Sequence, residues 1–166
     1  VDPYIVCHAQ SEKIESYIQR EGLDWESIRV PEPQSLGETI LKSLEYLESA
    51  GKLVDKQVYI HFADTLVEPL APEQDVDFVS YAIEHNPIRW TSFSPEDGRI
   101  ESITRKGSPD VQGDQPVFTG VFGITEPRSY RNALSESVVH TDEHSPDPFY
   151  TALLTYLRDR PHHLLE

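Results

Sequence analysis

Residues 57–63 read QVYIHFA, and Asp64 follows them directly. This run is rich in β-branched and aromatic residues, and it is the most strand-like stretch in the chain. A turn is expected to begin at Asp64. The sequence therefore predicts an apolar strand that carries a carboxylate at its carboxyl end.

Two further strand-like runs lie upstream, each followed by a helical pattern. Residues 3–8 and residues 27–30 are short apolar runs that predict strands. A helix is expected to start at Ser11, which can cap it, and to end near Gly22. Because strands alternate with helices here, the pattern predicts parallel pairing with right-handed crossovers.

The second helical pattern begins with a capping box. Ser35 and Glu38 have the S-x-x-E spacing in which each side chain can bond a backbone amide near the start of a helix. The expected helix ends at Gly51. Its apolar residues fall on one face, as in a helix packed on a core; they are Leu36, Ile40, Leu41, Leu44 and Leu47.

The second half of the chain changes character, because strand-like runs follow one another with short turns. Strands are expected at residues 76–83, 88–93, 99–105 and 117–124. Asp97-Gly98 is a strong hairpin signal, so some of these strands should pair antiparallel.

Two helices are expected near the end of the chain. Thr125 is a candidate cap for one of them, which contains Tyr130 and Leu134. Asp147 and Pro148 form a good N-cap and first-position pair for the other. The fold class predicted is α/β and Rossmann-like, with a mixed, mostly parallel sheet flanked by helices and antiparallel strands in the second half.

Composition limits the size, partners and location of the protein. A chain of 166 residues fits a single domain with one core. A net charge of -15 disfavours nucleic acid and anionic membranes as partners. The single cysteine, Cys7, allows no internal disulfide, which favours a reducing, cytoplasmic location.

The start of the chain is unusual. It begins with Val1 and contains no methionine. We therefore expect residues 1–166 to be a piece of a larger domain.

Asp64 is the first candidate site residue. Ligands of open α/β sheets bind beyond the carboxyl ends of the strands. A carboxylate there can hold Mg²⁺, which needs only one or two protein carboxylates when phosphate oxygens complete its shell. The alternative is that Asp64 only starts a turn.

The segment PQSLGET, residues 33–39, is the second candidate. Gln34 offers both a donor and an acceptor, as a nucleobase edge requires. Gly37 lets a backbone approach a flat ligand. The alternative is that this segment serves only as a helix cap.

Two further candidates lie in the second half. Lys106 ends a strand beside Arg105, and its charge could offset a substrate phosphate; an ordinary solvated cation is the alternative. Thr119 and Gly120 lie inside a strand, where a glycine marks either a bulge or the close approach of a ligand.

These pieces, in this order, resemble the sugar-phosphate nucleotidyltransferase family over roughly residues 1–160. In that family a Gln-x-x-Gly segment reads the base, and Gln34 and Gly37 match it. A later strand ends in an aspartate that binds Mg²⁺, which Asp64 matches, although Ala63 stands where the family usually has glycine. The Lys of RIESITRKG and the Gly of FTGVFGI resemble residues that contact the sugar phosphate and the sugar.

The resemblance implies transfer of a nucleotidyl group from an NTP to a sugar 1-phosphate, with release of pyrophosphate. Mg²⁺ would be the cofactor, and Asp64 and Lys106 would be the catalytic residues. Gln34, Gly37, Thr119 and Gly120 would bind the substrates. A homo-oligomer is possible.

Two family elements have no counterpart in these residues. The family's Gly-rich triphosphate loop and first strand would precede Val1, and its second metal-binding aspartate would follow Leu165. Because the first strand normally lies in the middle of the sheet, unpaired strand edges are expected. This chain alone should then have little turnover.

Two alternatives stay open. One is a non-catalytic module derived from the same fold that binds a nucleotide-sugar or a protein. The other is an enzyme for a non-sugar phosphate such as choline phosphate.

Overall fold

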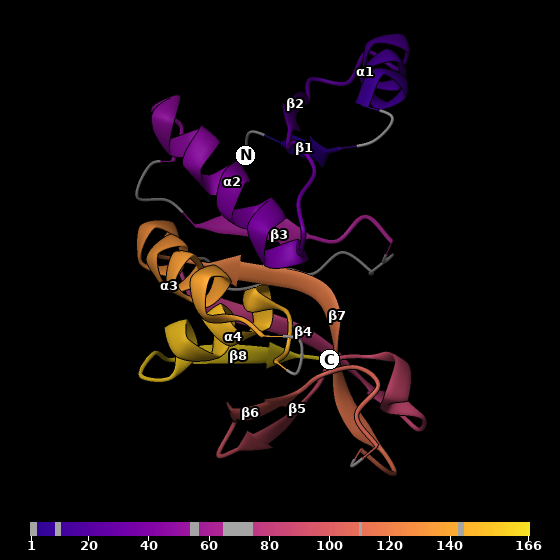
Figure 1. The fold of residues 1–166 in the computed structure, drawn as a ribbon, viewed down its shortest axis with the longest axis vertical. Coiled ribbons are helices and arrows are strands. Elements are labelled where there is room, and N and C mark those ends of the chain that lie inside the picture. Colours follow the sequence, from indigo (N-terminus) through magenta and orange to yellow (C-terminus); the bar gives the residue numbers. More distant parts are fainter. Residues whose placement is uncertain (1–2, 9–10, 54–56, 65–74, 110, 143–144) are drawn as a thin grey trace.

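The computed structural model describes residues 3–8, 11–53, 57–64, 75–109, 111–142 and 145–166 (Figure 1). The elements in chain order are β1 (Tyr4–Cys7), α1 (Ser11–Arg20), β2 (Glu26–Arg29), α2 (Leu36–Ser49), β3 (Val58–His61), β4 (Asp77–Glu84), the 3-10 helix η1 (Pro87–Arg89), β5 (Ser92–Glu96), β6 (Arg99–Thr104), β7 (Gln115–Ile124), α3 (Pro127–His140), α4 (Pro148–Leu157) and β8 (His162–Leu165). This is a mixed α/β fold, as the sequence predicts. The prediction of a mostly parallel sheet is wrong for the larger of its two sheets, because among the described strands of that sheet only the pairing of β4 with β8 is parallel.

The strands form two separate sheets. β1 and β2 make a parallel pair, which confirms the parallel pairing expected at the start of the chain. The larger sheet has six strands in the order β6-β5-β7-β4-β8, and β3 pairs with β7. β3 and β4 both run antiparallel to β7, whereas β8 is parallel to β4.

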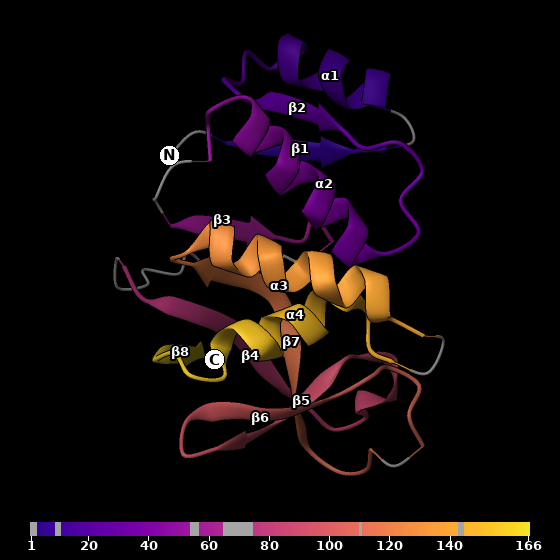
Figure 2. The same cartoon turned by 60° about the vertical axis from the view of Figure 1, so that its left-hand side comes forward.

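The pairing of β3 differs from the expectation. The β-α-β-α-β pattern predicts a parallel neighbour for β3, but its partner among the described strands is the antiparallel β7. Within the described residues, no ladder joins β1 to β3. Figure 2 shows the small sheet with α1 at one end of the molecule and the β5–β6 hairpin at the other.

The main core lies between the larger sheet and three helices. Helices α2, α3 and α4 cover one face of the sheet (Figure 2). This layer combines aliphatic and aromatic side chains, and Phe122 and Phe149 are completely buried with ring centroids 4.8 Å apart. Each such side chain contributes about 2–3 kcal/mol by burial, so this layer fixes where the ends of the helices lie.

Several local predictions are confirmed by the structure. Asp97 and Gly98 both have positive φ, at 49° and 75°, and they connect β5 to β6 in a hairpin. The side chain of Asp147 accepts a hydrogen bond from the Phe149 amide as the N-cap of α4.

Two local predictions are wrong, and one strand was not predicted. Residues 88–93 were expected to form a strand, but Pro87 opens the 3-10 helix η1 and β5 starts only at Ser92. Thr125 does not cap α3, because its amide and hydroxyl both bond the Asp77 carboxylate. β8 was not expected from the sequence.

None of the helices in the described part of the chain has the length and apolar character that a membrane crossing requires.

Candidate functional site

Asp64 lies just beyond the end of β3. The Phe62 amide donates to the Gly120 carbonyl at 2.9 Å, so the backbone still follows β7 one residue past the strand. Ala63 and Asp64 then form a turn, and Asp64 is exposed. The structure therefore places this carboxylate at the carboxyl end of an apolar strand, as the sequence predicts.

The Gln34–Gly37 turn precedes α2 and is closed by the predicted capping box. Ser35 Oγ accepts from the Glu38 amide at 3.0 Å. The Glu38 carboxylate accepts in return from the Gln34 amide at 2.6 Å. This bond from Gln34, followed by the ion pair with Lys42, lowers the pKa of Glu38. The turn is therefore held by an ionised carboxylate.

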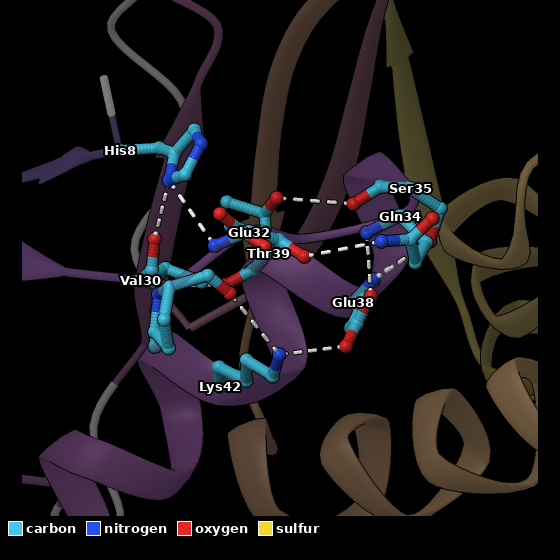
Figure 3. A network of polar contacts seen from close by, with 10 residues as sticks. His8, Val30, Glu32, Gln34, Ser35, Glu38, Thr39 and Lys42 are labelled. Atoms are coloured by element: carbon cyan, nitrogen blue, oxygen red, sulfur yellow. Dashed lines mark hydrogen bonds and ion pairs between the residues drawn. The ribbon is translucent and has the colours of Figure 1, made fainter.

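A polar network connects this turn to the small sheet (Figure 3). The Gln34 side-chain amide donates to the Glu32 carbonyl at 3.4 Å, and the Glu32 amide donates to His8 Nδ1 at 3.1 Å. Lys42 Nζ donates to the Pro31 carbonyl at 3.4 Å. Gln34 remains exposed, so its side chain faces solvent at the edge of this network.

The carboxylate of Asp147 bonds the backbone of the same turn from the other side. Its Oδ2 accepts from the Leu36 amide at 3.0 Å, and its Oδ1 accepts from the Gly37 amide at 2.9 Å. Oδ1 also accepts from the Phe149 amide at 2.9 Å. One side chain thus joins the first turns of α2 and α4.

Close packing between these two helices explains the glycine at position 37. A Cβ added to Gly37 would lie 2.7 Å from the Phe149 nitrogen and 2.7 Å from Pro148 Cβ. Any side chain there would push α4 away. Whether Gly37 also contacts a base stays a prediction.

Burial and the charges of Asp147 and Asp64 all affect the pKa of the Tyr150 hydroxyl. Burial is the main cause that raises the pKa of its hydroxyl to about 12. The charges of Asp147 and Asp64 raise it further, while a hydrogen bond with Thr91 acts in the opposite direction. Phe62, two residues before Asp64, packs its ring against Phe149 with centroids 5.4 Å apart, so Asp64 follows a segment that contacts the start of α4.

Thr119 and Gly120 lie at a bulge in β7. The register of β4 against β7 shifts between Val79 and Tyr81, opposite these residues. Gly120 has a φ of +89°, and an added Cβ would lie 2.8 Å from the Phe62 ring. Thr119 Oγ1 donates to Ser80 Oγ at 2.6 Å. Of the two explanations for this glycine, the bulge is present.

Lys106 lies in the turn after β6. The Gly107 amide donates to the Ile88 carbonyl at 2.6 Å, which holds this turn against η1. Lys106 is exposed. Within the described residues, no hydrogen bond or ion pair joins Lys106 to Gln34, Thr119 or Gly120.

At this site the described residues offer few protein ligands to a metal ion. No group of three or more His, Cys, Asp or Glu side chains with metal-binding geometry occurs in the part of the chain that the structure describes. Asp64 offers an exposed carboxylate at a strand end, which is a type of ligand that Mg²⁺ accepts when phosphate oxygens complete its shell.

Sequence reasoning did not predict a place for Tyr150 near the site, nor the bonds of Asp147 to the Gln34–Gly37 turn. Asp147 was recognised only as a cap for its own helix, because its bond to Gly37 spans 110 residues. The Asp147-Pro148 pair, which predicts the start of α4, is the only local feature of the sequence that draws attention to Asp147.

Comparisons with known proteins were made on sequence and on structure. No protein-family model matches the chain, and no curated protein matches it by sequence. The structure is similar to a protein assigned as a glucose-1-phosphate thymidylyltransferase from Bacillus anthracis, solved with sucrose, with a TM-score of 0.68 and 8% identity. It is also similar to a UDP-glucose pyrophosphorylase bound to UDP-glucose, with a TM-score of 0.65 and 14% identity.

A third similar structure is a 4-diphosphocytidyl-2C-methyl-D-erythritol synthase, with a TM-score of 0.55 and 14% identity over 100% of this chain. The alignments cover 97% and 98% of this chain for the first two proteins, but only 65% and 72% of their own lengths. The chain therefore has a sugar-phosphate nucleotidyltransferase-like fold and spans about two thirds of these neighbours.

Proposed function

We propose that this chain is the nucleotide-binding part of an enzyme that transfers a nucleotidyl group from an NTP to a sugar 1-phosphate. One observation carries the proposal. Phe62, two residues before Asp64, packs its ring against Phe149 in the first turn of α4, and Asp147 at the start of that helix bonds the turn that contains Gln34. A candidate metal ligand and a candidate base reader thus belong to one region of a nucleotidyltransferase-like fold.

The chemistry proposed is an in-line attack of a sugar-phosphate oxygen on the α-phosphorus, with pyrophosphate as the leaving group. Such a reaction needs positioning and charge neutralisation rather than a covalent enzyme intermediate. Mg²⁺, held by Asp64, would neutralise phosphate charge when bound. In a chain with a net charge of -15, a bound cation also offsets the repulsion of an anionic substrate.

The other predicted residues have proposed roles at the same site. Gln34, which is exposed, would hydrogen-bond the base edge. Gly37 would let α4 approach so that the turn is held in place. Lys106 would meet the sugar phosphate, and Thr119 and Gly120 would lie near the sugar.

A non-catalytic nucleotide-binding or protein-binding module is the second candidate. Ala63 favours it, because the family that the chain resembles usually has glycine before the metal-binding aspartate. The enzyme and the non-catalytic module would have the same fold, so a measurement of activity is needed to distinguish them.

The binding test is a calorimetric titration of the chain with each common NTP, with and without Mg²⁺. We expect binding that requires Mg²⁺ and is weakened at least about tenfold by Asp64→Asn, because the variant loses the charge that holds the cation. Asp24→Asn is the matched control, since Asp24 is also exposed but lies in the irregular segment before β2. Equal effects of the two substitutions would contradict the proposal.

A pyrophosphate-release assay over pairs of NTP and sugar 1-phosphate then separates the two candidates. Turnover that Asp64→Asn removes supports the enzyme. Mg²⁺-dependent binding without turnover supports the module.

A further inference from the structure

The first turns of two helices meet at a single carboxylate. The amides of Leu36 and Gly37 belong to the start of α2, and the amide of Phe149 belongs to the start of α4. All three donate to Asp147 within 2.9–3.0 Å. The first amides of a helix have no partner within the helix, so Asp147 satisfies such groups in two helices at once.

This arrangement exceeds what capping α4 requires. A single oxygen from Ser, Thr or Asn would serve as the N-cap of α4. Here Oδ1 accepts two bonds and Oδ2 accepts the third, so both carboxylate oxygens are used. Two helix N-termini also place partial positive charge beside this group, which favours a full negative charge over a neutral side chain.

The bridge controls the position of the turn that contains Gln34. Gly37 has no side chain, and the Phe149 nitrogen and Pro148 fill the space where a Cβ would lie. The turn is therefore in direct contact with α4. Two residues after Asp147, the Phe149 ring packs against the ring of Phe62, which lies two residues before Asp64, with centroids 5.4 Å apart. The first turn of α4 thus connects the Gln34 turn with the Asp64 region.

We propose that Asp147 is a positioning residue that fixes Gln34 relative to Asp64 and thereby sets which nucleobase the site prefers. This inference rests on the proposed function. Asp147 does not touch the nucleotide; it acts through the backbone of Leu36 and Gly37. A shift of this turn moves the base-reading side chain while leaving the phosphate-binding carboxylate in place.

The substitution Asp147→Asn separates this role from simple capping. Asparagine keeps Oδ1, so it can still cap α4 through the Phe149 amide. Its NH₂ group replaces Oδ2 and faces the Leu36 amide, so one bridging bond is lost and two donors oppose each other. Amide hydrogen exchange of the nucleotide-free variant should show faster exchange at Leu36 and retained protection at Phe149.

The functional readout is the ratio between the dissociation constants of the weakest-binding and the tightest-binding NTP, measured with Mg²⁺. The dissociation constant of tripolyphosphate is measured under the same conditions. In Asp147→Asn we expect the ratio between bases to fall by about fivefold or more, because the turn that carries Gln34 loses a hydrogen bond to a charged group. Binding of tripolyphosphate should change less than about twofold, since Asp64 holds that part.

Leu134→Ala is the control for a general loss of stability, because Leu134 is fully buried on α3 and lies outside the site. It should leave the base ratio unchanged. If Asp147→Asn weakens every NTP and tripolyphosphate by the same factor, or leaves the base ratio unchanged, the positioning role is overturned.

A wild-type chain that binds no NTP would overturn the proposed function and, with it, the role in base choice. The exchange of the Leu36 amide would still report whether the bridge exists, so the two failures are distinguishable.

Discussion

Close contact between side chains and backbone explains the two glycines of the candidate site. Gly37 lies against the start of α4, and Gly120 lies against the Phe62 ring at the end of β3. In both cases the neighbour comes from a distant part of the chain. A local sequence window suggests that the glycine has a purpose, but it does not contain the residue that makes glycine necessary.

Of these two glycines, Gly120 is the better position at which to measure how an added side chain changes stability. In Gly120→Ala the new Cβ would lie 2.8 Å from Phe62 Cδ2, and the φ of +89° is unfavourable for any residue with a side chain. We expect a loss of at least about 2 kcal/mol in the free energy of unfolding, measured by urea denaturation. Gly113→Ala is the control, because Gly113 has a φ of +72° but open space around it. Equal losses in the two variants would contradict the packing explanation.

Glu38 makes the Gln34 turn sensitive to acid. Its pKa is lowered from 4.5, first by the bond from the Gln34 amide and then by Lys42. A lowered folded-state pKa means that this contribution is present above pH 4.5 and is lost as the pH falls through the folded-state value. The Gln34 amide resonance should therefore titrate with a midpoint below 4.5. In Glu38→Gln this titration should disappear; a midpoint at or above 4.5 in the wild type would argue against the bond.

At the scale of elements, signals that act through adjacent residues gave correct predictions. The Asp97-Gly98 turn, the Ser35–Glu38 capping box and the Asp147-Pro148 start of α4 depend on a few neighbouring residues. The prediction failed at η1, where Pro87 favours a helical turn over an extended run. β8 was missed because its four residues include two histidines and the strand depends on pairing with β4.

The start of α3 is fixed by α4 and not by its own cap. Tyr156 Oη on α4 accepts from the Glu126 amide at 3.0 Å and donates to the Asp77 carboxylate at 2.9 Å. Tyr156→Phe leaves both partners with one bond fewer, and we expect a loss of about 1–3 kcal/mol of stability in thermal or urea unfolding. Tyr46→Phe, which removes an exposed hydroxyl that donates to Glu26, should cost far less. Similar losses of stability in the two variants would show that the hydrogen bonds of Tyr156 do not stabilise the start of α3.

At the scale of the whole molecule, the described strands fall into two sheets that no ladder connects. Unpaired edges were expected from the family resemblance, and the division lies between β1 and β3. Sequence reasoning gave the mixed α/β class and the positions of most strands. It could not give the partner of β3, because strand pairing joins residues far apart and each strand is compatible with several neighbours.

Among the described strands β1 pairs only with β2, which predicts uneven hydrogen exchange along β1. The Pro3 and Cys7 carbonyls accept from Glu26 and Val30 on the β2 side. Because successive residues of a strand point their backbone groups to opposite edges, the amides of Tyr4 and Val6 face away from β2.

In hydrogen exchange followed by NMR, the amides of Tyr4 and Val6 should therefore exchange at least about tenfold faster than those of Ile5 and Cys7. Equal protection of all four would show that another strand covers this edge, and a dependence on protein concentration would identify it as a second copy.

The central claim is that a metal–nucleotide complex binds between Asp64 and the Gln34 turn. Mn²⁺ can replace Mg²⁺ in such a complex, and its unpaired electrons broaden the NMR signals of nearby nuclei. With a Mn²⁺–NTP complex, the account predicts broadening centred on Asp64 and reaching Leu36, Gly37 and Tyr150, beyond that caused by Mn²⁺ alone, and its loss in Asp64→Asn. Broadening spread over unrelated acidic residues, or unchanged in that variant, would contradict it.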